Sequence, residues 1–440
     1  MKFLNYSPPH SPLLDEQRDA LQKGLGRAMQ WALDGCLDDE LLLEACLRDQ
    51  RFDVQCEASR GNWLWQIIQA IIATQRFRVP ILHALHDLSA ERSASQLCEL
   101  ALCYAKTGDG AFRDRLYEIV EQRPFPESPW LGEEEIVALD GERAFLFAAR
   151  LRGHQLGTRE WEWDDGSLVT QVIDQFGEER VNNLLEPSSD NAVRTFLDSW
   201  RRDKQRTADR KQPEAHRERM KAIPVEEIIR AAEGDTKCYW FRGWGMHATE
   251  AELQTILQRL WIAEDPRIIA NLIKVFGARA LPLFDARLIE LCRHGHEEVR
   301  RSAFRALEKN THPLVREFAQ TEIQKGVRGI FPVGLFINNY RRGDEQLILE
   351  AMELPDDACE LHWLLMDVIK VLENNTMADC SRLGVLSYAS TPCENCRFHA
   401  AHLLFDQRLA PQWLAEECRY DSSKDCRNFV GEVVGSSGTP

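Results

Sequence analysis

Four possible metal ligands occur at every third residue near the end of the chain: Cys393, Cys396, His399 and His402. Thiolate sulfur and imidazole nitrogen are the ligands that tetrahedral zinc takes in proteins. Because neighbouring residues of a helix are about 100° apart, four ligands with this spacing cannot face one ion from a single helix. A metal would need Cys393 in the loop before the helix and a ligand from the next helix, such as Cys418. The sequence therefore favours small buried thiols, and we expect no metal or other cofactor.

The aromatic segment 238–247, Cys-Tyr-Trp-Phe-Arg-Gly-Trp-Gly-Met-His, is a second candidate site. Trp and Arg are frequent in the hot spots of protein interfaces. Glycines on both sides of Trp244 permit an exposed turn, so a recognition loop would bind through Trp240, Arg242, Trp244 and His247. The alternative, which we favour, is a buried plug between the two halves of the chain, because exposed clustered aromatics promote aggregation.

Polar residues also gather in segment 53–60, directly before an apolar helical pattern. Asp49, Asp53 and Glu57 are spaced by four, so a continuous helix would place their carboxylates on one face. Paired carboxylates can act as acid and base where burial separates their pKa values. We favour the structural alternative, in which Asp53 caps a helix and Glu57 forms an ion pair with Arg60.

The remaining motifs argue against an enzyme of a common class. The sequence contains no phosphate-binding P-loop, no dinucleotide fingerprint, no Gly-x-Ser-x-Gly elbow and no His-Glu-x-x-His pair. The 54 Lys+Arg and 70 Asp+Glu give a formal net charge of −16. That sign is wrong for a phosphate ligand, so nucleic acid is not an expected partner.

Composition also indicates where the protein works. No apolar run approaches the roughly 18–20 residues of a membrane-spanning helix, and the first residues turn polar too early for a secretory segment. The 13 cysteines are odd in number and scattered, which suits free thiols in a reducing compartment. We therefore expect a cytoplasmic protein without a membrane contact.

The elements that must position these residues have a helical pattern almost throughout. Apolar runs such as residues 67–72 and 97–103 are separated by short Gly, Pro or Asn breaks. Alternating β-type runs bounded by hairpin turns are nearly absent. The sequence therefore predicts an all-α fold.

Residues 201–221 interrupt this pattern with nine Lys/Arg, four Asp/Glu and few apolar side chains. Such a segment cannot bury a face, so we expect a solvated linker or helix extension. The expected organisation is an N-terminal tail at 1–15, helical repeats at 16–200, the charged segment at 201–224, further repeats at 225–434 and a flexible tail at 435–440.

The C-terminal half contains an internal repeat with a period near 30–32 residues and two helices per unit. Such a period is typical of an α-solenoid. Helix starts are marked independently by Asp265-Pro266 and by the capping box of Thr249 and Glu252. The copies are Glu298-Val299-Arg300, Asn395-Cys396-Arg397 and Asp425-Cys426-Arg427, each with a small or apolar residue three positions after the arginine.

The motif Val299-Arg300-x-x-Ala303-x-x-Ala306-Leu307 resembles that of HEAT repeats, and weaker copies begin at Cys396 and Cys426. The resemblance covers roughly residues 225–431. It implies an α-solenoid of antiparallel helix pairs. HEAT-like proteins are mostly scaffolds and binding surfaces, with a few enzymes among them.

The functional expectation is a non-enzymatic protein-binding scaffold or adaptor that uses a groove formed by the second helices of the repeats. One alternative is a HEAT-like nucleic-acid-binding or DNA-repair protein. Another is an enzyme of an unrecognised class with a site near residues 53–60 or 240–247. The sequence leaves the partner's identity and the oligomeric state open.

Overall fold

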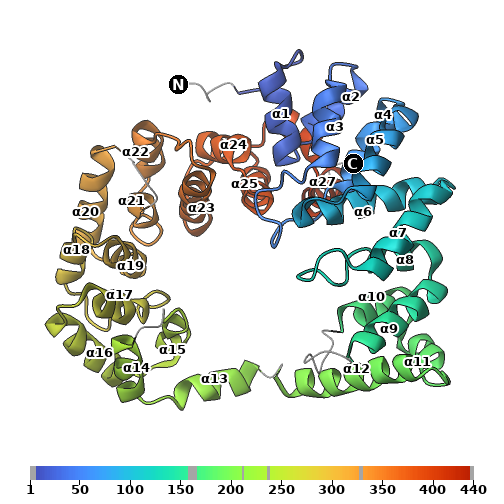
Figure 1. Cartoon of the computed structure of the whole chain (residues 1–440). Coiled ribbons are helices and arrows are strands. Elements are labelled where there is room, and N and C mark those ends of the chain that lie inside the picture. The colour runs from blue at the N-terminus through green and yellow to red at the C-terminus, as the bar shows by residue number, and fades with distance from the viewer. Residues whose placement is uncertain (1–5, 157–165, 211–212, 235–237, 327–330, 437–440) are drawn as a thin grey trace. The chain divides into compact units, whose positions relative to one another are not determined.

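The computed structural model describes residues 6–156, 166–210, 213–234, 238–326 and 331–436. Within these ranges the regular elements are helices and there is no strand (Figure 1). The all-α prediction is thereby confirmed. None of the described helices combines the length and the apolar character needed to cross a membrane.

The helices form two compact units, and neither unit is a continuous stretch of chain. The first, here called the N-unit, consists of Pro8–Lys211 and Ala415–Pro440. The second, the C-unit, consists of Met1–Ser7 and Gln212–Leu414. The N-unit therefore contains the C-terminal end of the chain, and the C-unit contains the N-terminal end. The junction at 211–212 lies inside the charged segment 201–221.

The described residues form 27 helices. Those of the N-unit are α1 (Leu14–Lys23), α2 (Arg27–Leu33), α3 (Asp39–Leu47), α4 (Gly61–Ala70), α5 (Thr74–His86), α6 (Glu91–Lys106), α7 (Gly110–Gln122), α8 (Glu133–Asp140), α9 (Glu142–Leu156), α10 (Ser167–Phe176), α11 (Glu178–Leu185), α12 (Asn191–Arg210) and α27 (Lys424–Ser436). Those of the C-unit are α13 (Pro213–Lys221), α14 (Val225–Glu233), α15 (Phe241–His247), α16 (Glu250–Ile262), α17 (Pro266–Lys274), α18 (Arg287–Leu291), α19 (Glu297–Leu307), α20 (Pro313–Gln324), α21 (Phe331–Gly334), α22 (Asp344–Ala351), α23 (Ala358–Asn374), α24 (Ser381–Ser390) and α25 (Glu394–Asp406). Helix α26 (Gln412–Arg419) spans the junction between the units.

Within each unit the helices pack in chain order. In the C-unit, one layer is built by successive contacts of α17, α19, α21, α23 and α25, and a second layer by α20, α22 and α24 (Figure 1). In the N-unit the same alternation joins α2, α4, α6 and α8 in one series and α1, α3, α5 and α7 in another. Among the described residues, the principal helix contacts join elements at most three places apart. Each helix thus buries its apolar face mainly against near neighbours in the chain.

The predicted helix starts are found where the local chemistry places them. The hydroxyl of Thr249 accepts from the backbone N–H of Glu252, and the Glu252 carboxylate accepts from the backbone N–H of Thr249 at 2.7 Å. Asp265 accepts from the backbone N–H of Arg267 at 2.8 Å, and Pro266 occupies the first turn of α17. Both caps satisfy N–H groups that have no partner inside their helix.

The repeated motif also behaves as a structural unit. Val299, Cys396 and Cys426 are all buried, as are the residues four positions after them. The arginine that follows makes a recurring backbone contact. Nη1 of Arg300 donates to the carbonyl oxygens five and six residues earlier at 2.9 Å each. Nη1 of Arg427 donates to the carbonyls at the same two offsets, and Nε of Arg194 in α12 donates to the carbonyl six residues earlier at 2.9 Å.

Two helix pairs approach so closely that glycine is required at the contact. A Cβ on Gly153 of α9 would lie 1.8 Å from the carbonyl oxygen of Ala192 in α12. A Cβ on Gly245 of α15 would lie 1.9 Å from the carbonyl oxygen of Val275, directly after α17. Backbone atoms cannot yield as a flexible side chain can, so any larger residue must separate the helices.

We expect Gly245→Ala to lower the free energy of unfolding of the C-unit by about 2–4 kcal/mol, because the added methyl group overpacks the α15–α17 contact. Gly243→Ala is the matched control on the same helix, since nothing lies within 4 Å of its Cβ position. The control should be neutral or stabilising by up to about 1 kcal/mol, because alanine favours helix. Urea unfolding followed by circular dichroism measures both, and equal stability of the two variants would contradict the close-contact argument.

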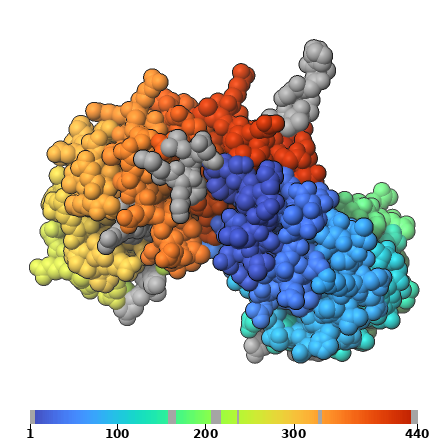
Figure 2. All heavy atoms as spheres, turned by 90° about the horizontal axis from the view of Figure 1, so that it is seen from above, coloured from blue at the N-terminus to red at the C-terminus, as the bar shows by residue number. Residues whose placement is uncertain are grey.

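A buried ion pair fixes the C-terminal segment to the first helices of the N-unit. Arg27 donates to Glu417 through Nη2 at 2.8 Å and through Nε at 2.9 Å, across 390 residues of sequence. The backbone N–H of Ser422 donates to the carbonyl of Gly24 at 2.9 Å. In Figure 2 the red surface of the C-terminal segment lies against the dark-blue surface of the first helices. The two ends of this unit are therefore joined by specific polar contacts.

Removing one member of this pair leaves the other charge buried without its main partner. Glu417→Ala should therefore destabilise the N-unit by about 3–5 kcal/mol. The neighbouring Glu416 pairs with Arg419 where both side chains are about half exposed, so Glu416→Ala should change stability by no more than about 0.5 kcal/mol. Thermal and urea unfolding of both variants test this, and a Glu417→Ala cost no larger than that of Glu416→Ala would count against it.

Candidate functional site

The aromatic segment is a helix, α15, and not the loop expected from its glycines. The reason is visible at Gly245, which serves the close approach to the chain after α17 and makes no turn. Gly243 lies in open space on the same helix. Gly245 thus serves helix packing, which a single sequence does not distinguish from a turn, and Gly243 has no such contact.

The four residues predicted to bind through this segment are separated by the helix. Trp244 is 1% exposed, and its Nε1 donates to the carbonyl of Ile223 at 3.0 Å, so it is a core side chain. Trp240 is 39% exposed and Arg242 is exposed, while His247 is half-buried. Trp240 and Arg242 are consequently accessible to a partner, whereas Trp244 is not.

One of the two interpretations of segment 53–60, a continuous helix with aligned carboxylates, does not agree with the structure. Helix α3 ends at Leu47 and α4 begins at Gly61, and the residues between them form no continuous helix. Asp49, Asp53 and Glu57 therefore do not share a helix face. The expectation of three aligned carboxylates is wrong because the chain turns between the two helices.

The carboxylates of this segment are instead engaged in structure. Glu57 pairs with Arg60 at 2.9 Å, as predicted, and both side chains are buried. Asp49 pairs with Arg51, again out of solvent. Asp53 accepts from the backbone N–H two residues later and so caps a short turn, not a helix. Buried charges that are paired in this way serve the fold.

Three side chains with metal-binding or nucleophilic atoms converge in the C-unit. The ligand atoms of His362, Cys393 and Cys396 all lie within 4.8 Å of one another. Nδ1 of His362 is 3.7 Å from Sγ of Cys396. The two cysteines are buried and the imidazole is half-buried. This cluster, called the thiol–imidazole cluster below, therefore has one side open to solvent.

Local structure places the cluster at the start of a helix. Cys393 is the N-cap residue of α25 with an extended backbone, and Cys396 lies in the first turn. The backbone N–H of Cys393 donates to the buried hydroxyl of Thr391 at 3.3 Å, which fixes the entering chain. His362 comes from α23, which packs beside α25 in the same layer. Three ligands from two helices can converge where four from one helix cannot.

Interactions within the cluster shift the pKa values of its two thiols in opposite directions. The pKa of Cys393 is lowered to about 4, chiefly because the Cys396 thiol donates a hydrogen bond to it, with His362 and the Cys396 backbone N–H also favouring the thiolate against burial. The pKa of Cys396 is raised, first by the same hydrogen bond and then by burial. Cys393 is thus the thiol of the pair that ionises more readily. A thiolate beside a thiol and an imidazole can act as a nucleophile or as a metal ligand.

Of the five residues considered as metal ligands from the sequence, the structure brings two together. His402 is not one of them, and its Nδ1 pairs with Asp406 at 2.9 Å. Cys393 and Cys396 belong to the cluster. His399 points elsewhere, since its Nδ1 pairs with Glu373 at 2.7 Å, and Cys418 belongs to the N-unit. Sequence reasoning missed His362 because it lies outside the local motif. It is 31 residues before Cys393, which is one repeat period, and that spacing is the signal that could have found it.

A second buried polar group lies between α19 and α23 of the C-unit. Nη1 of Arg305 donates to Glu308 at 2.8 Å and to Asp367 at 3.0 Å. Burial, followed by the nearby Asp367 charge, raises the pKa of Glu308 to about 7, although Arg305 opposes the shift. A Cβ at Gly334 would lie 2.6 Å from the Glu308 carboxylate, so the backbone of α21 closes over the acid. Each of these residues is isolated in the sequence, which gave no indication of the group.

Cations and aromatic side chains surround this buried group. The positive charges of Arg242, Lys370 and Arg305 all act on Lys309 and, with burial as the largest cause, lower its pKa. Trp363, 43% exposed, has the Arg305 guanidinium 5.7 Å from its ring centroid. We call this surface the cationic face. It consists of Arg242, Arg305, Lys309, Trp363 and Lys370.

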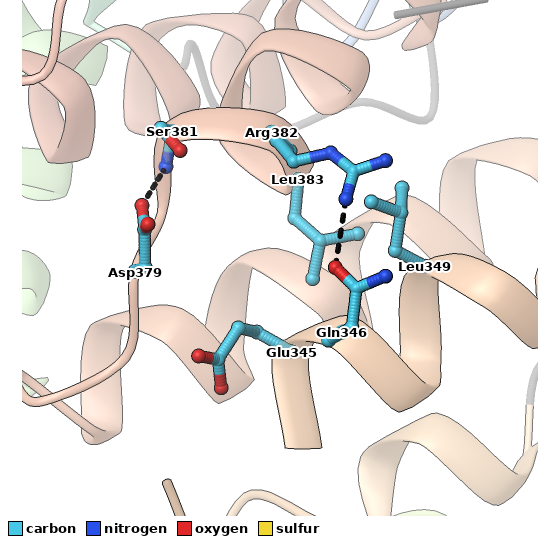
Figure 3. Close-up of a pocket in the computed structure, with 7 residues that line it drawn as sticks. All are labelled: Glu345, Gln346, Leu349, Asp379, Ser381, Arg382 and Leu383. Atoms are coloured by element: carbon cyan, nitrogen blue, oxygen red, sulfur yellow. Dashed lines mark hydrogen bonds between the residues drawn. The ribbon is translucent and has the colours of Figure 1, made fainter. Parts of the chain in front are cut away.

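Two pockets among the described residues are poor candidates for a substrate site. One in the N-unit, lined by Leu47, Ala84 and Leu97 among others, has a volume of about 180 Å³. The one between α22 and α24, drawn in Figure 3, has a volume of about 80 Å³. Two of its polar side chains are engaged within the protein: Arg382 donates to Gln346 at 2.7 Å, and Asp379 accepts from the backbone N–H of Ser381 at 2.9 Å. Typical ligand pockets hold about 300–1,000 Å³. Both pockets are therefore too small for an organic substrate of ordinary size.

The raised pKa of Glu308 predicts a pH-dependent contribution to stability. Because the folded carboxyl holds its proton up to about pH 7 and an unfolded glutamate only to about 4.3, this stabilisation is present below about pH 4 and is lost as pH rises through 7. Glu308→Gln keeps an acceptor and removes the ionisation. Relative to wild type, the variant should therefore gain on the order of 2 kcal/mol between pH 5 and pH 8.

Urea unfolding at pH 5, 6, 7 and 8 tests this expectation. Glu322→Gln is the control, because Glu322 pairs with Lys325 near the surface and should show no comparable pH trend. A stability difference between wild type and Glu308→Gln that does not change with pH would be inconsistent with the buried, protonated acid.

Comparison with known proteins adds no relative. No protein-family model, no curated protein and no solved structure matches the chain. The resemblance to HEAT repeats therefore depends on the residues of the repeated motif alone. The function has to be argued from the surfaces and side-chain clusters described above.

Proposed function

We propose that the chain is an α-solenoid of HEAT-like helix pairs that acts as a protein-binding scaffold. The cationic face of the C-unit would hold an acidic and partly apolar segment of the partner. The exposed Trp363 next to arginine and lysine side chains, which come from separate parts of the C-unit, is the observation that carries this proposal. Trp and Arg are the residue types that most often dominate the energy of protein interfaces.

The helix order supports the solenoid part of the proposal. Principal contacts between described helices stay within three places of chain order, as expected where each repeat contacts only its neighbours. The backbone contact of Arg194, Arg300 and Arg427 recurs at the same offset in both units. A shared local contact in helices far apart in sequence is what repetition of one unit predicts.

The charges favour an acidic ligand at this face even though the whole chain carries −16. Arg242 is exposed. Three further cations, Arg305, Lys309 and Lys370, share the two acids beneath the face, so the positive charges outnumber the negative ones. Like charges gathered on one surface attract an oppositely charged segment and disfavour basic ones. The partner's binding segment should therefore contain Asp or Glu beside an apolar anchor that packs on Trp363.

A nucleic acid is the second candidate, because the same cations could contact phosphates. The face carries the exposed ring of Trp363, on which a single-stranded base can stack. The overall negative charge opposes this reading, since long-range repulsion acts on a polyanion. Salt-dependent retention of single-stranded DNA by the purified protein, in the absence of any protein partner, would favour it.

Affinity capture from native cell extract tests the scaffold proposal, with bound proteins identified by mass spectrometry and their affinity then measured. Arg242→Glu and Trp363→Ala should each weaken binding of the captured partner about tenfold or more. Lys325→Glu, at the end of α20 in the other layer, is the control and should leave affinity unchanged. Equal binding by all three variants would exclude the cationic face as the binding surface.

A further inference from the structure

The thiol–imidazole cluster has nearly the dimensions of a tetrahedral metal site. With metal–sulfur bonds of about 2.3 Å and metal–nitrogen bonds of about 2.05 Å, tetrahedral angles separate sulfur from nitrogen by about 3.6 Å and two sulfurs by about 3.8 Å. Nδ1 of His362 is 3.7 Å from Sγ of Cys396. All three ligand atoms fall within 4.8 Å of one another. Small side-chain rotations would therefore bring the three atoms onto one ion.

We infer that His362, Cys393 and Cys396 form a binding site for Zn²⁺ in which the fourth position is left to water or to an external ligand. Two sulfurs and one imidazole nitrogen are the donor set that zinc accepts, and oxygen-seeking Ca²⁺ and Mg²⁺ do not. Any thiol proton displaced by the ion passes to solvent, so no oxidant or reductant is needed.

Burial supports a specific site over accidental proximity. Cys393 and Cys396 are 4% and 7% exposed, so competing water has little access to the sulfurs. The half-buried imidazole of His362 provides the entry path that a metal site requires. The hydroxyl of Thr391, held by the Cys393 backbone N–H, lies at the same turn and restrains its geometry.

The ion would connect two helices that are not adjacent in sequence. His362 lies near the start of α23 and the cysteines at the start of α25, two neighbours in one layer of the C-unit. Bonds from both helices to one ion would hold them together in addition to their packing contacts. Because the ion binds only the folded arrangement, its binding free energy adds to the stability of this unit. An open fourth position would also let a partner's side chain complete the coordination.

The competing chemistry is a Cys393–Cys396 disulfide, which would use the same two sulfurs. Its formation removes two protons and two electrons and so needs an external oxidant. The two thiols are free in this structure. A stable disulfide in protein purified under a mild thiol, with no metal bound, is the result expected of that alternative.

Titration of the reduced full-length protein with Co²⁺ tests the inference, because tetrahedral cobalt with thiolate ligands has strong visible and near-ultraviolet absorption. We expect one ion per chain, displaced stoichiometrically by Zn²⁺. Cys393→Ser, Cys396→Ser and His362→Gln should each weaken binding at least tenfold. The control is Cys359→Ser, an exposed thiol one turn before His362 on the same helix, which should bind as wild type does.

Two measurements on the unmodified protein keep the test independent of how the variants fold. Zn²⁺ should protect Cys393 and Cys396, but not Cys359, from alkylation mapped by mass spectrometry. Zn²⁺ at 100-fold above its dissociation constant should raise the melting temperature of the C-unit by roughly 5 °C. No cobalt spectrum with thiolate character, no protection of the two thiols, or a resident disulfide would each overturn the inference.

Discussion

The fold depends on one constraint: most described helices bury their apolar faces against helices one, two or three places away in the chain. The N-unit also joins two distant segments, through the Arg27–Glu417 ion pair, and the glycine contacts at Gly153 and Gly245 show how little space separates some neighbours. We expect a substitution that disturbs one helix to affect mainly the helices that adjoin it. The arrangement also presents a long surface on which side chains from several helices lie in a row.

Both candidate sites follow from this layered packing. The thiol–imidazole cluster combines α23 with α25, and the cationic face combines α15, α19 and α23. In each case the participating residues come from more than one helix and not from one local motif alone. The buried acids Glu308 and Asp367 lie under the cationic face and keep Arg305 in a fixed position. The position of the Arg305 charge at the surface is therefore set by the buried acids.

Much of the fold was predictable because its determinants are local. The caps at Thr249 and Asp265 and the buried positions that begin with Val299 were read from residues a few places apart, and the structure has them as predicted. The sites were not predictable in the same way. His362 lies beside Cys393 because one repeat separates them in the chain. The close contact at Gly245 likewise depends on where the backbone after α17 lies. Such contacts require the packing of whole helices, which local spacing does not encode.

The exchange of terminal segments between the units has a consequence for any dissection of the protein. The chain passes from one unit to the other after Ser7, after Lys211 and after Leu414. Expressing either half as a fragment cut at the charged junction would omit part of the unit it was meant to contain, including Glu417 and its contact with Arg27. A circularly permuted chain that starts at residue 415 would instead place both segments of the N-unit next to one another in the sequence, separated only by Met1–Ser7.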